Sequence, residues 1–337
     1  MRRTIPLIPR VFLVAGFFTG AILGAARATH PTRAHDQAYR YHSLMPQYWE
    51  FIKGNVNSDD ASTLTRFRAE VVNPHREVFD AVAAGWIDDA SLPRFIHALD
   101  GKFGQLHRVD RQFPLRLAVA WQRFAQQVPD LKPGADVFLI PAPRIAVGGA
   151  VRPLGERNAV IFGSEEISTV IESQTAFNVL ANHEMTHLYH MQVNPEIRRM
   201  IAEVYMPPYA TDRAKLYQVL WLEGLAAYMS KASNPEATDK EVLLSDSVAK
   251  EVKALWPRIG ADIRQHLDSS KKDDIDAYLF DNDASGMIPK RAGYYVGMLI
   301  AKKLAKKYSF AELCRLSGPQ LRSEVERSLG ELESAGI

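Results

Sequence analysis

The first third of the chain has apolar residues at helical spacing. Large apolar side chains recur three and four positions apart in two stretches, between residues 92 and 99 and between residues 117 and 128. Ser91 precedes the first stretch and Pro129 follows the second, as is typical of a helix start and a helix end. Residues at this spacing share one face of a helix. We therefore predict that residues 29–130 form core-facing helices.

The pattern changes after Lys132-Pro133-Gly134. Short runs of β-branched and apolar residues follow and are separated by proline and glycine, a pattern that favours strands. The runs are Val137–Ile140, Ile145–Gly148 and Ala159–Phe162. A loop is expected around Pro153-Leu154-Gly155, between the second run and the third.

Helical patterns resume after residue 170. Between a cap at Ser173 or Thr175 and a stop at Asn194-Pro195, apolar positions recur at three and four residues. A second apolar stretch, Trp221–Tyr228, is also helical in pattern, and residues 241–268 are predicted to be helical and solvent-facing. We expect a charged loop at Lys271–Asp274, followed by a helix over 291–308 in which Gly293, Gly297 and Ala301 form a stripe suited to close helix packing. The fold class is thus α+β and mostly helical, with a small sheet.

The N-terminus has the pattern of a leader. Arg2, Arg3 and Arg10 precede an uncharged apolar run over 11–26, and Ala26-Arg27-Ala28 offers a small-x-small cleavage site. We predict a signal peptide over 1–28, a helical region over 29–130 and a catalytic domain over 131–337. We therefore expect the protein to be secreted or periplasmic. The alternative is a membrane anchor formed by the same segment, which would be the chain's one membrane contact, although the run is short for a span.

Composition and charge narrow the classes of partner. With 337 residues, of which 47% are hydrophobic and 24% charged, the chain can bury a sizeable core. Removing residues 1–28 takes away four arginines, so 41 basic and 39 acidic residues become 37 and 39. The net charge of the remaining chain is then about −2. The remainder has no basic patch interleaved with aromatics, which argues against nucleic acid as a partner. The single Cys314 cannot form an internal disulfide or a thiolate zinc site.

The strongest chemical signal is His183-Glu184-Met185-Thr186-His187, an HExxH sequence inside a predicted helix. The two histidines lie on one face, about 6 Å apart along the axis, so both imidazoles can reach one zinc ion. Glu184 is then placed as the general base that takes a proton from the zinc-activated water. His190 lies on the same stripe, but it is about 10 Å along the axis from His183, which suits a pocket wall better than a third ligand. The alternative to all of this is a chance match, because the motif is short.

Glu223 is our candidate for the third ligand. It stands in the apolar stretch Trp221–Tyr228, where an unpaired carboxylate would cost several kcal/mol. Gly224, Ala226 and Ala227 are small enough to let this helix approach the HExxH helix closely. The alternatives are an exposed glutamate or a buried ion pair.

These motifs, in this order, resemble the gluzincin class of zinc metallopeptidases. Within that class the chain is similar to bacterial predicted zinc-dependent proteases that combine HExxH, an EGLA-type helix and a later Gly-Tyr-x-x-Gly helix, here Gly293–Gly297. The resemblance covers about residues 135–308 and implies a zincin-like fold with the small sheet before the active helix. It also nominates Tyr294 as a catalytic hydrogen-bond donor, while Tyr295, about 100° away around the helix, is expected in the core. The 35 residues between His187 and Glu223 are more than in thermolysin-like gluzincins, which weakens transfer of their substrate preference.

The resemblance also gives a role to a strand. In gluzincins an edge strand before the active helix holds the substrate backbone by strand addition, and residues 146–150 are the candidate here. The alternative is a structural hairpin in which Gly148-Gly149 makes the turn.

Together these features predict an exported zinc peptidase. Zn²⁺ is the expected cofactor, held by His183, His187 and Glu223, and a peptide or protein is the expected substrate. The alternative is a non-catalytic metal-binding or interaction protein of the cell envelope. A zinc hydrolase that acts on non-peptide amides cannot be separated from the peptidase by sequence.

Overall fold

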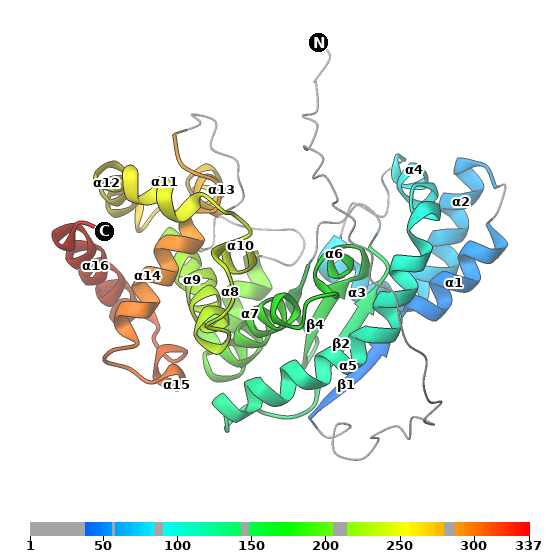
Figure 1. Ribbon diagram of the computed structural model, residues 1–337, viewed down its shortest axis with the longest axis horizontal. Helices are drawn as coiled ribbons and strands as arrows, with labels where there is room; N and C mark the ends of the chain where they lie inside the picture. Colours follow the sequence, from blue (N-terminus) through cyan, green and yellow to red (C-terminus); the bar gives the residue numbers. More distant parts are fainter. Residues whose placement is uncertain (1–37, 56–57, 84–89, 143–147, 205–213, 280–286) are drawn as a thin grey trace, which may run out of the picture. The chain divides into compact units, whose positions relative to one another are not determined.

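A computed structural model of the chain describes residues 38–55, 58–83, 90–142, 148–204, 214–279 and 287–337, all within one unit. The predicted leader over 1–28 and most of the run Ile145–Gly148 lie outside these residues. Helices predominate and a four-stranded sheet precedes most of them, so the predicted fold class is confirmed (Figure 1). Among the described helices, none combines the length and apolarity needed to cross a membrane.

The sheet has the strand order β1-β2-β4-β3. Neighbours β1–β2 and β2–β4 are parallel, while β3 and β4 form an antiparallel hairpin. The strands are β1 Tyr39–Ser43, β2 Ala135–Ile140, β3 Ala150–Leu154 and β4 Arg157–Gly163. Strands β2 and β4 contain two of the predicted runs, and every residue of β2 is buried.

Two features of the sheet differ from the sequence prediction. Strand β1 lies in the region expected to be helical, where Tyr39 and Tyr41 alternate with Arg40 and His42 in the period of a strand. The expected loop at Pro153 is instead the end of β3, and the chain turns after it at Gly155, whose φ is +58°. Proline is tolerated there because β3 is an edge strand, so its missing N–H leaves no neighbouring strand unpaired.

The helices before the sheet's second strand pack around aromatic side chains. The long α5 covers the face of the sheet that carries Tyr39 and Tyr41. The ring centroids of Trp121 and Tyr39 are 4.5 Å apart, and those of Phe113 and Tyr41 are 5.7 Å apart. The elements are α1 Met45–Gly54, α2 Asp60–Phe67, a π-helical turn η1 Arg68–Val72, a 3₁₀ turn η2 Asn73–His75, α3 Arg76–Ala83, α4 Leu92–His97, a 3₁₀ turn η3 Asp100–Lys102 and α5 Phe103–Gln127. Both predicted helical stretches are thus present, and α5 is longer than predicted because it continues through Pro114.

The later helices form the rest of the core. They are α6 Ser164–Val170, α7 Gln174–Val193, α8 Pro195–Val204, α9 Leu216–Ser233, α10 Asp239–Leu243, α11 Val248–Ala254, α12 Trp256–His266, α13 Lys272–Leu279, α14 Ala292–Leu304, α15 Phe310–Leu313 and α16 Gly318–Ala335. The predicted helical segment 241–268 is three short helices, and it is not simply solvent-facing, because Val248, Val252 and Ile263 are fully buried. The expected charged loop at Lys271–Asp274 instead begins α13, whose first turn holds Asp273 and Asp274, as the helix dipole favours.

Helices α9 and α14 cross at an unusually short distance. A β-carbon at Gly224 would lie 2.2 Å from the backbone of Gly297, and one at Gly297 would lie 2.1 Å from the carbonyl oxygen of Leu220. The predicted glycine stripe on α14 therefore does allow close packing. Gly224, which we expected to face the HExxH helix, faces α14 instead. Its neighbour Glu223 points about 100° away and takes the side toward α7.

Candidate metal centre

Helix α7 holds the HExxH residues in a rigid setting. Ser173, one of the two caps that the sequence allowed, caps its N-terminus by accepting a hydrogen bond from the Ala176 N–H at 3.1 Å, and Asn194 ends it. Farther along, the Tyr189 hydroxyl donates to the Asp130 carboxylate at 2.8 Å. The Ser230 hydroxyl of α9 donates to the Val179 carbonyl at 3.0 Å, which fixes the two helices side by side. These anchors leave the histidine face of α7 directed at α9.

His183, His187 and Glu223 meet between α7 and α9. His183 Nε2 is 3.2 Å from Glu223 Oε2 and 3.1 Å from His187 Nε2, and His187 Nε2 is 3.6 Å from Glu223 Oε2. His187 and Glu223 are buried, and His183 is partly exposed. The group can therefore hold a metal ion, with one nitrogen or oxygen offered by each side chain. The structure thus brings together the three residues that the sequence nominated as metal ligands.

The electrostatics of Glu223 suit a metal ligand. Burial alone would raise the pKa of this carboxyl, but His187 and His183 beside it hold the pKa well below its usual range. The carboxylate is therefore charged. A buried negative charge between two imidazoles attracts a cation strongly, since little water remains to screen it.

Glu184 is buried next to this group without belonging to it. Burial raises its pKa to about 7, and the Glu223 charge adds to that shift, while His183 and Arg152 oppose it. A carboxyl with a pKa near 7 can exchange a proton at neutral pH. The position is thus suited to a general acid or base.

Gly149 makes room for the Glu184 side chain. A β-carbon at position 149 would lie 2.3 Å from Glu184 Cγ, so any other residue there would displace the carboxyl. Gly149 directly precedes edge strand β3, and the β3–β4 turn is at Gly155, not at Gly148-Gly149. The sequence shows the glycine pair but not this contact, because residues 149 and 184 approach only through the packing of β3 on α7.

His190 stays apart from the group. It is fully buried, its pKa is lowered by burial to about 3, and neither ring nitrogen has a hydrogen-bond partner in the described part of the chain. The imidazole is therefore neutral at physiological pH. This agrees with the expectation that His190 is not the third ligand.

Tyr294 lies beside His183. The two rings are stacked, with their centroids 6.2 Å apart. Burial raises the pKa of Tyr294 far above its usual value, and the charge of Glu223 and a hydrogen bond with it add to the shift. Its hydroxyl is therefore protonated and able to donate. Tyr295 is buried in the core, as predicted.

Arg291 is a residue that sequence reasoning missed. It immediately precedes α14 in a left-handed conformation with a φ of 61°, and its guanidinium carbon lies 4.0 Å from the centre of the Tyr294 ring. Because residues three positions apart are neighbours on a helix, the sequence could have indicated that Arg291 lies beside Tyr294.

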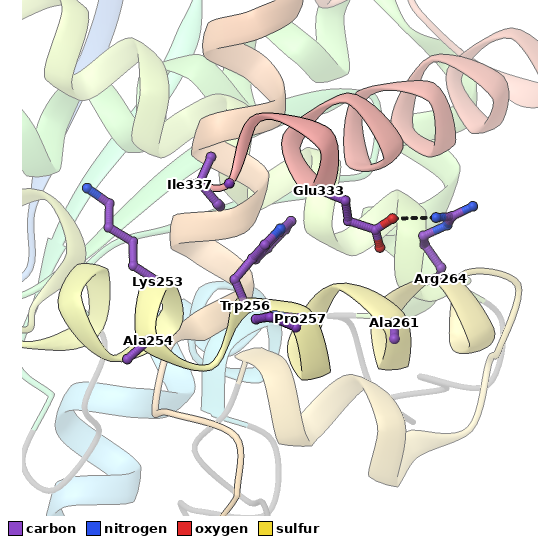
Figure 2. Close-up of a pocket in the computed structure, with 9 residues that line it drawn as sticks. Lys253, Ala254, Trp256, Pro257, Ala261, Arg264, Glu333 and Ile337 are labelled. Carbon is purple, nitrogen blue, oxygen red and sulfur yellow. Dashed lines mark hydrogen bonds and ion pairs between the residues drawn. The ribbon is translucent and has the colours of Figure 1, made fainter.

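A separate pocket of about 820 Å³ lies between α11, α12 and the end of α16 (Figure 2). Trp256 forms its centre, and Arg264 at its rim is paired with Glu333 at 2.5 Å. Its lining contains none of the metal-binding group. The candidate centre and this pocket are therefore distinct places on the chain.

Comparison of the chain with known protein families, with curated proteins and with solved structures found no significant match. The similarity to gluzincins thus rests on the motifs and on the geometry of the three side chains.

Proposed function

We propose that this protein is a zinc-dependent peptidase. The observation that carries the proposal is the meeting of His183, His187 and Glu223 within 3.6 Å, with the buried carboxyl of Glu184 beside them. Two histidines and a carboxylate are a ligand set of catalytic zinc, in which a fourth position stays open.

The distances in the group support zinc. Ligand atoms at 2.0–2.2 Å from zinc in a tetrahedron lie about 3.3–3.6 Å apart. The three separations of 3.1, 3.2 and 3.6 Å are close to that range without any side chain having to turn away. A hexacoordinate magnesium or calcium site would instead require mainly oxygen ligands.

In this proposal His183, His187 and Glu223 would hold a zinc ion, which would polarise the scissile carbonyl and make a water molecule more acidic. Glu184 accepts the proton of the attacking water and later delivers it to the nitrogen of the leaving amine. Its pKa of about 7 suits both transfers, since the group must gain and lose a proton in each cycle. Tyr294, kept protonated by burial, donates a hydrogen bond to the developing negative charge on the carbonyl oxygen.

The alternative of a non-catalytic metal-binding protein explains fewer features. Holding a metal requires the three ligands but not Glu184 or the space that Gly149 leaves for it. A buried carboxyl that is kept beside the ligands, at a cost in desolvation, favours an enzyme. The proposal includes export to the periplasm or beyond. Only the leader pattern of residues 1–28 supports this part of it.

The test combines metal content with cleavage. The purified chain should contain one zinc per molecule by elemental analysis and should cleave members of a diverse peptide library, with products identified by mass spectrometry. His183→Ala should lose both zinc and cleavage, while Gly330→Ala, in open space on α16, should keep both. Zinc at full occupancy with no cleavage of any peptide would favour the non-catalytic alternative.

A further inference from the structure

We propose that Arg291 recognises a carboxylate of the substrate close to the scissile bond. This inference rests on the proposed peptidase function, because it takes the ligand of Arg291 to be the substrate of that enzyme. The carboxylate is either the free C-terminus of a peptide or an acidic side chain, and both offer the same two oxygens to a guanidinium.

The position of Arg291 relative to the centre supports this role. Its guanidinium carbon is 4.0 Å from the Tyr294 ring centre, which is 6.2 Å from that of His183. The guanidinium is therefore no more than about 10 Å from the His183 ring. One residue of extended chain spans about 3.3–3.6 Å, so a carboxylate one or two residues from the scissile bond is within reach.

The guanidinium is held in place but not neutralised. Arg291 Nε donates to the Leu243 carbonyl at 2.8 Å, and the guanidinium carbon lies over the Tyr294 ring. Among the residues that the structure describes, no carboxylate pairs with Arg291 and its terminal nitrogens form no hydrogen bond. Arg291 as a whole is partly exposed, and its terminal nitrogens keep their capacity to donate hydrogen bonds to a ligand.

The backbone on both sides of this anchor is strained. Arg291 has a φ of 61°, and Leu244, next to the accepting Leu243 carbonyl, has a φ of 53°. Left-handed conformations of residues other than glycine are energetically unfavourable and tend to persist where function requires a fixed geometry. Keeping two such residues around one hydrogen bond is consistent with a guanidinium that must be held in one position.

The charges of the centre also favour an anion. The positive charge of Arg152 acts on Glu184, and that of Arg291 acts on Tyr294, so two guanidinium groups contribute positive potential near the centre. An anionic ligand group is attracted to such a field, and a carboxylate that meets the planar guanidinium can accept two parallel hydrogen bonds.

The experiment measures binding without turnover. Zinc-loaded Glu184→Gln protein is titrated in a calorimeter with N-acetyl-phenylalanyl-alanine as the free acid and as the C-terminal amide. A second pair, N-acetyl-phenylalanyl-aspartyl amide and its asparaginyl counterpart, presents the carboxylate on a side chain. We expect one acid of these pairs to bind about 10- to 100-fold more tightly than its neutral partner. The pair that discriminates identifies the source of the carboxylate.

Variants assign the effect to Arg291. Adding Arg291→Gln should reduce binding of the acid to that of the neutral partner without changing the neutral partner's affinity, and Arg291→Lys should retain part of the preference. Lys290→Gln, which removes the same charge from an exposed neighbour, should keep the full preference. Equal zinc content and thermal midpoint in all variants show that they are folded.

Two results would overturn the proposal. One is the absence of any difference between acids and neutral partners, including no binding of either. The other is an equal loss of both in Arg291→Gln, which would make Arg291 a support for Tyr294 alone. If the wild-type chain cleaves no peptide but Arg291 still confers the acid preference, the proposed peptidase function is wrong and the proposed carboxylate site is supported.

Discussion

Gly224 of α9 and Gly297 of α14 face each other where these helices cross, and neither position has room for a β-carbon. The crossing brings Tyr294, one turn before Gly297, to the same side as Glu223, which precedes Gly224. Two glycines that carry no chemistry thus determine how close the proposed hydrogen-bond donor lies to the proposed metal ligand.

We expect Gly297→Ala to damage stability and metal binding together. The added methyl would lie 2.1 Å from the Leu220 carbonyl oxygen, so the helices must separate, at a cost of about 1–3 kcal/mol or more. Glu223 would move with α9, and zinc affinity should fall. Chemical denaturation and metal titration measure the two effects. Gly330→Ala, with open space around it, should be neutral or stabilise by up to about 1 kcal/mol. Unchanged stability in Gly297→Ala would show that the helices are not held at this distance.

Glu184→Gln should separate metal binding from catalysis. Because Glu184 is not among the three converging ligands, zinc occupancy should stay near that of the wild type. Peptide hydrolysis should fall at least ~100-fold, since the amide cannot accept the proton. Elemental analysis and a cleavage assay on one sample check both. Full activity in this variant would remove Glu184 from the mechanism.

Glu223→Ala and His190→Ala should differ in metal affinity. Loss of Glu223 removes one of three ligands and leaves two imidazoles, so zinc affinity should drop by orders of magnitude. His190→Ala leaves the three ligands intact, although it opens a cavity in the core and should reduce stability by about 2–5 kcal/mol, as large-to-small core changes do. Competition with a chelator of known affinity measures the first effect. A weaker affinity in His190→Ala than in Glu223→Ala would reverse the assignment.

Tyr294→Phe should slow turnover without unfolding the protein. The ring that stacks on His183 is kept and only the hydroxyl is lost. If the hydroxyl stabilises the transition state, kcat should fall by ~10- to 1000-fold while zinc content and thermal stability change little. Tyr295→Phe is the matched control, since Tyr295 is a buried core residue. A larger loss in the control would assign the donor role elsewhere.

Glu324 should make stability depend on acid pH. Burial would raise its pKa, but hydrogen bonds from Lys307, Tyr308 and Arg327 lower the pKa to about 2, below the value of 4.5 in an unfolded chain. A depressed carboxyl pKa contributes stability that is complete above pH 4.5 and is lost as the pH falls from about 4.5 to about 2. Glu324→Gln should lower stability at pH 7 by roughly 1–3 kcal/mol and flatten the acid dependence in that window.

Urea denaturation at several pH values between 2 and 7 measures this dependence. Glu326→Gln is the control, because Glu326 forms an exposed pair with Arg322 on the same helix. An equally steep loss of stability in Glu324→Gln and in the wild type would show that other groups control the acid dependence.

Local patterns were sufficient for the elements that carry the chemistry. The sequence offered Ser173 or Thr175 as the cap and Asn194-Pro195 as the stop, and in the structure Ser173 and Asn194 bound α7. The four-residue spacing of His183 and His187 places both on one face whatever surrounds the helix. The small residues of α14 likewise indicated close packing before any partner was known.

The partners of these elements were decided by tertiary structure alone. Periodicity does not record which helix a small residue faces, so Gly224 was assigned to α7 although it packs on α14. Strand β1 is too short for its alternation to outweigh the helical signals around it, and it becomes a strand by pairing with β2, far along the chain. Tertiary structure alone also decided that Gly149 packs against Glu184 and that Arg291 lies over the Tyr294 ring. The sequence by itself therefore determined which side chains could bind a metal and move a proton. The reason is that His183, Glu184 and His187 depend on spacing within one helix, and Glu223 is marked by its place in an apolar stretch. Only the packing of distant segments decided what lies beside them, because burial, close approach and unpaired charge are properties of neighbours in space.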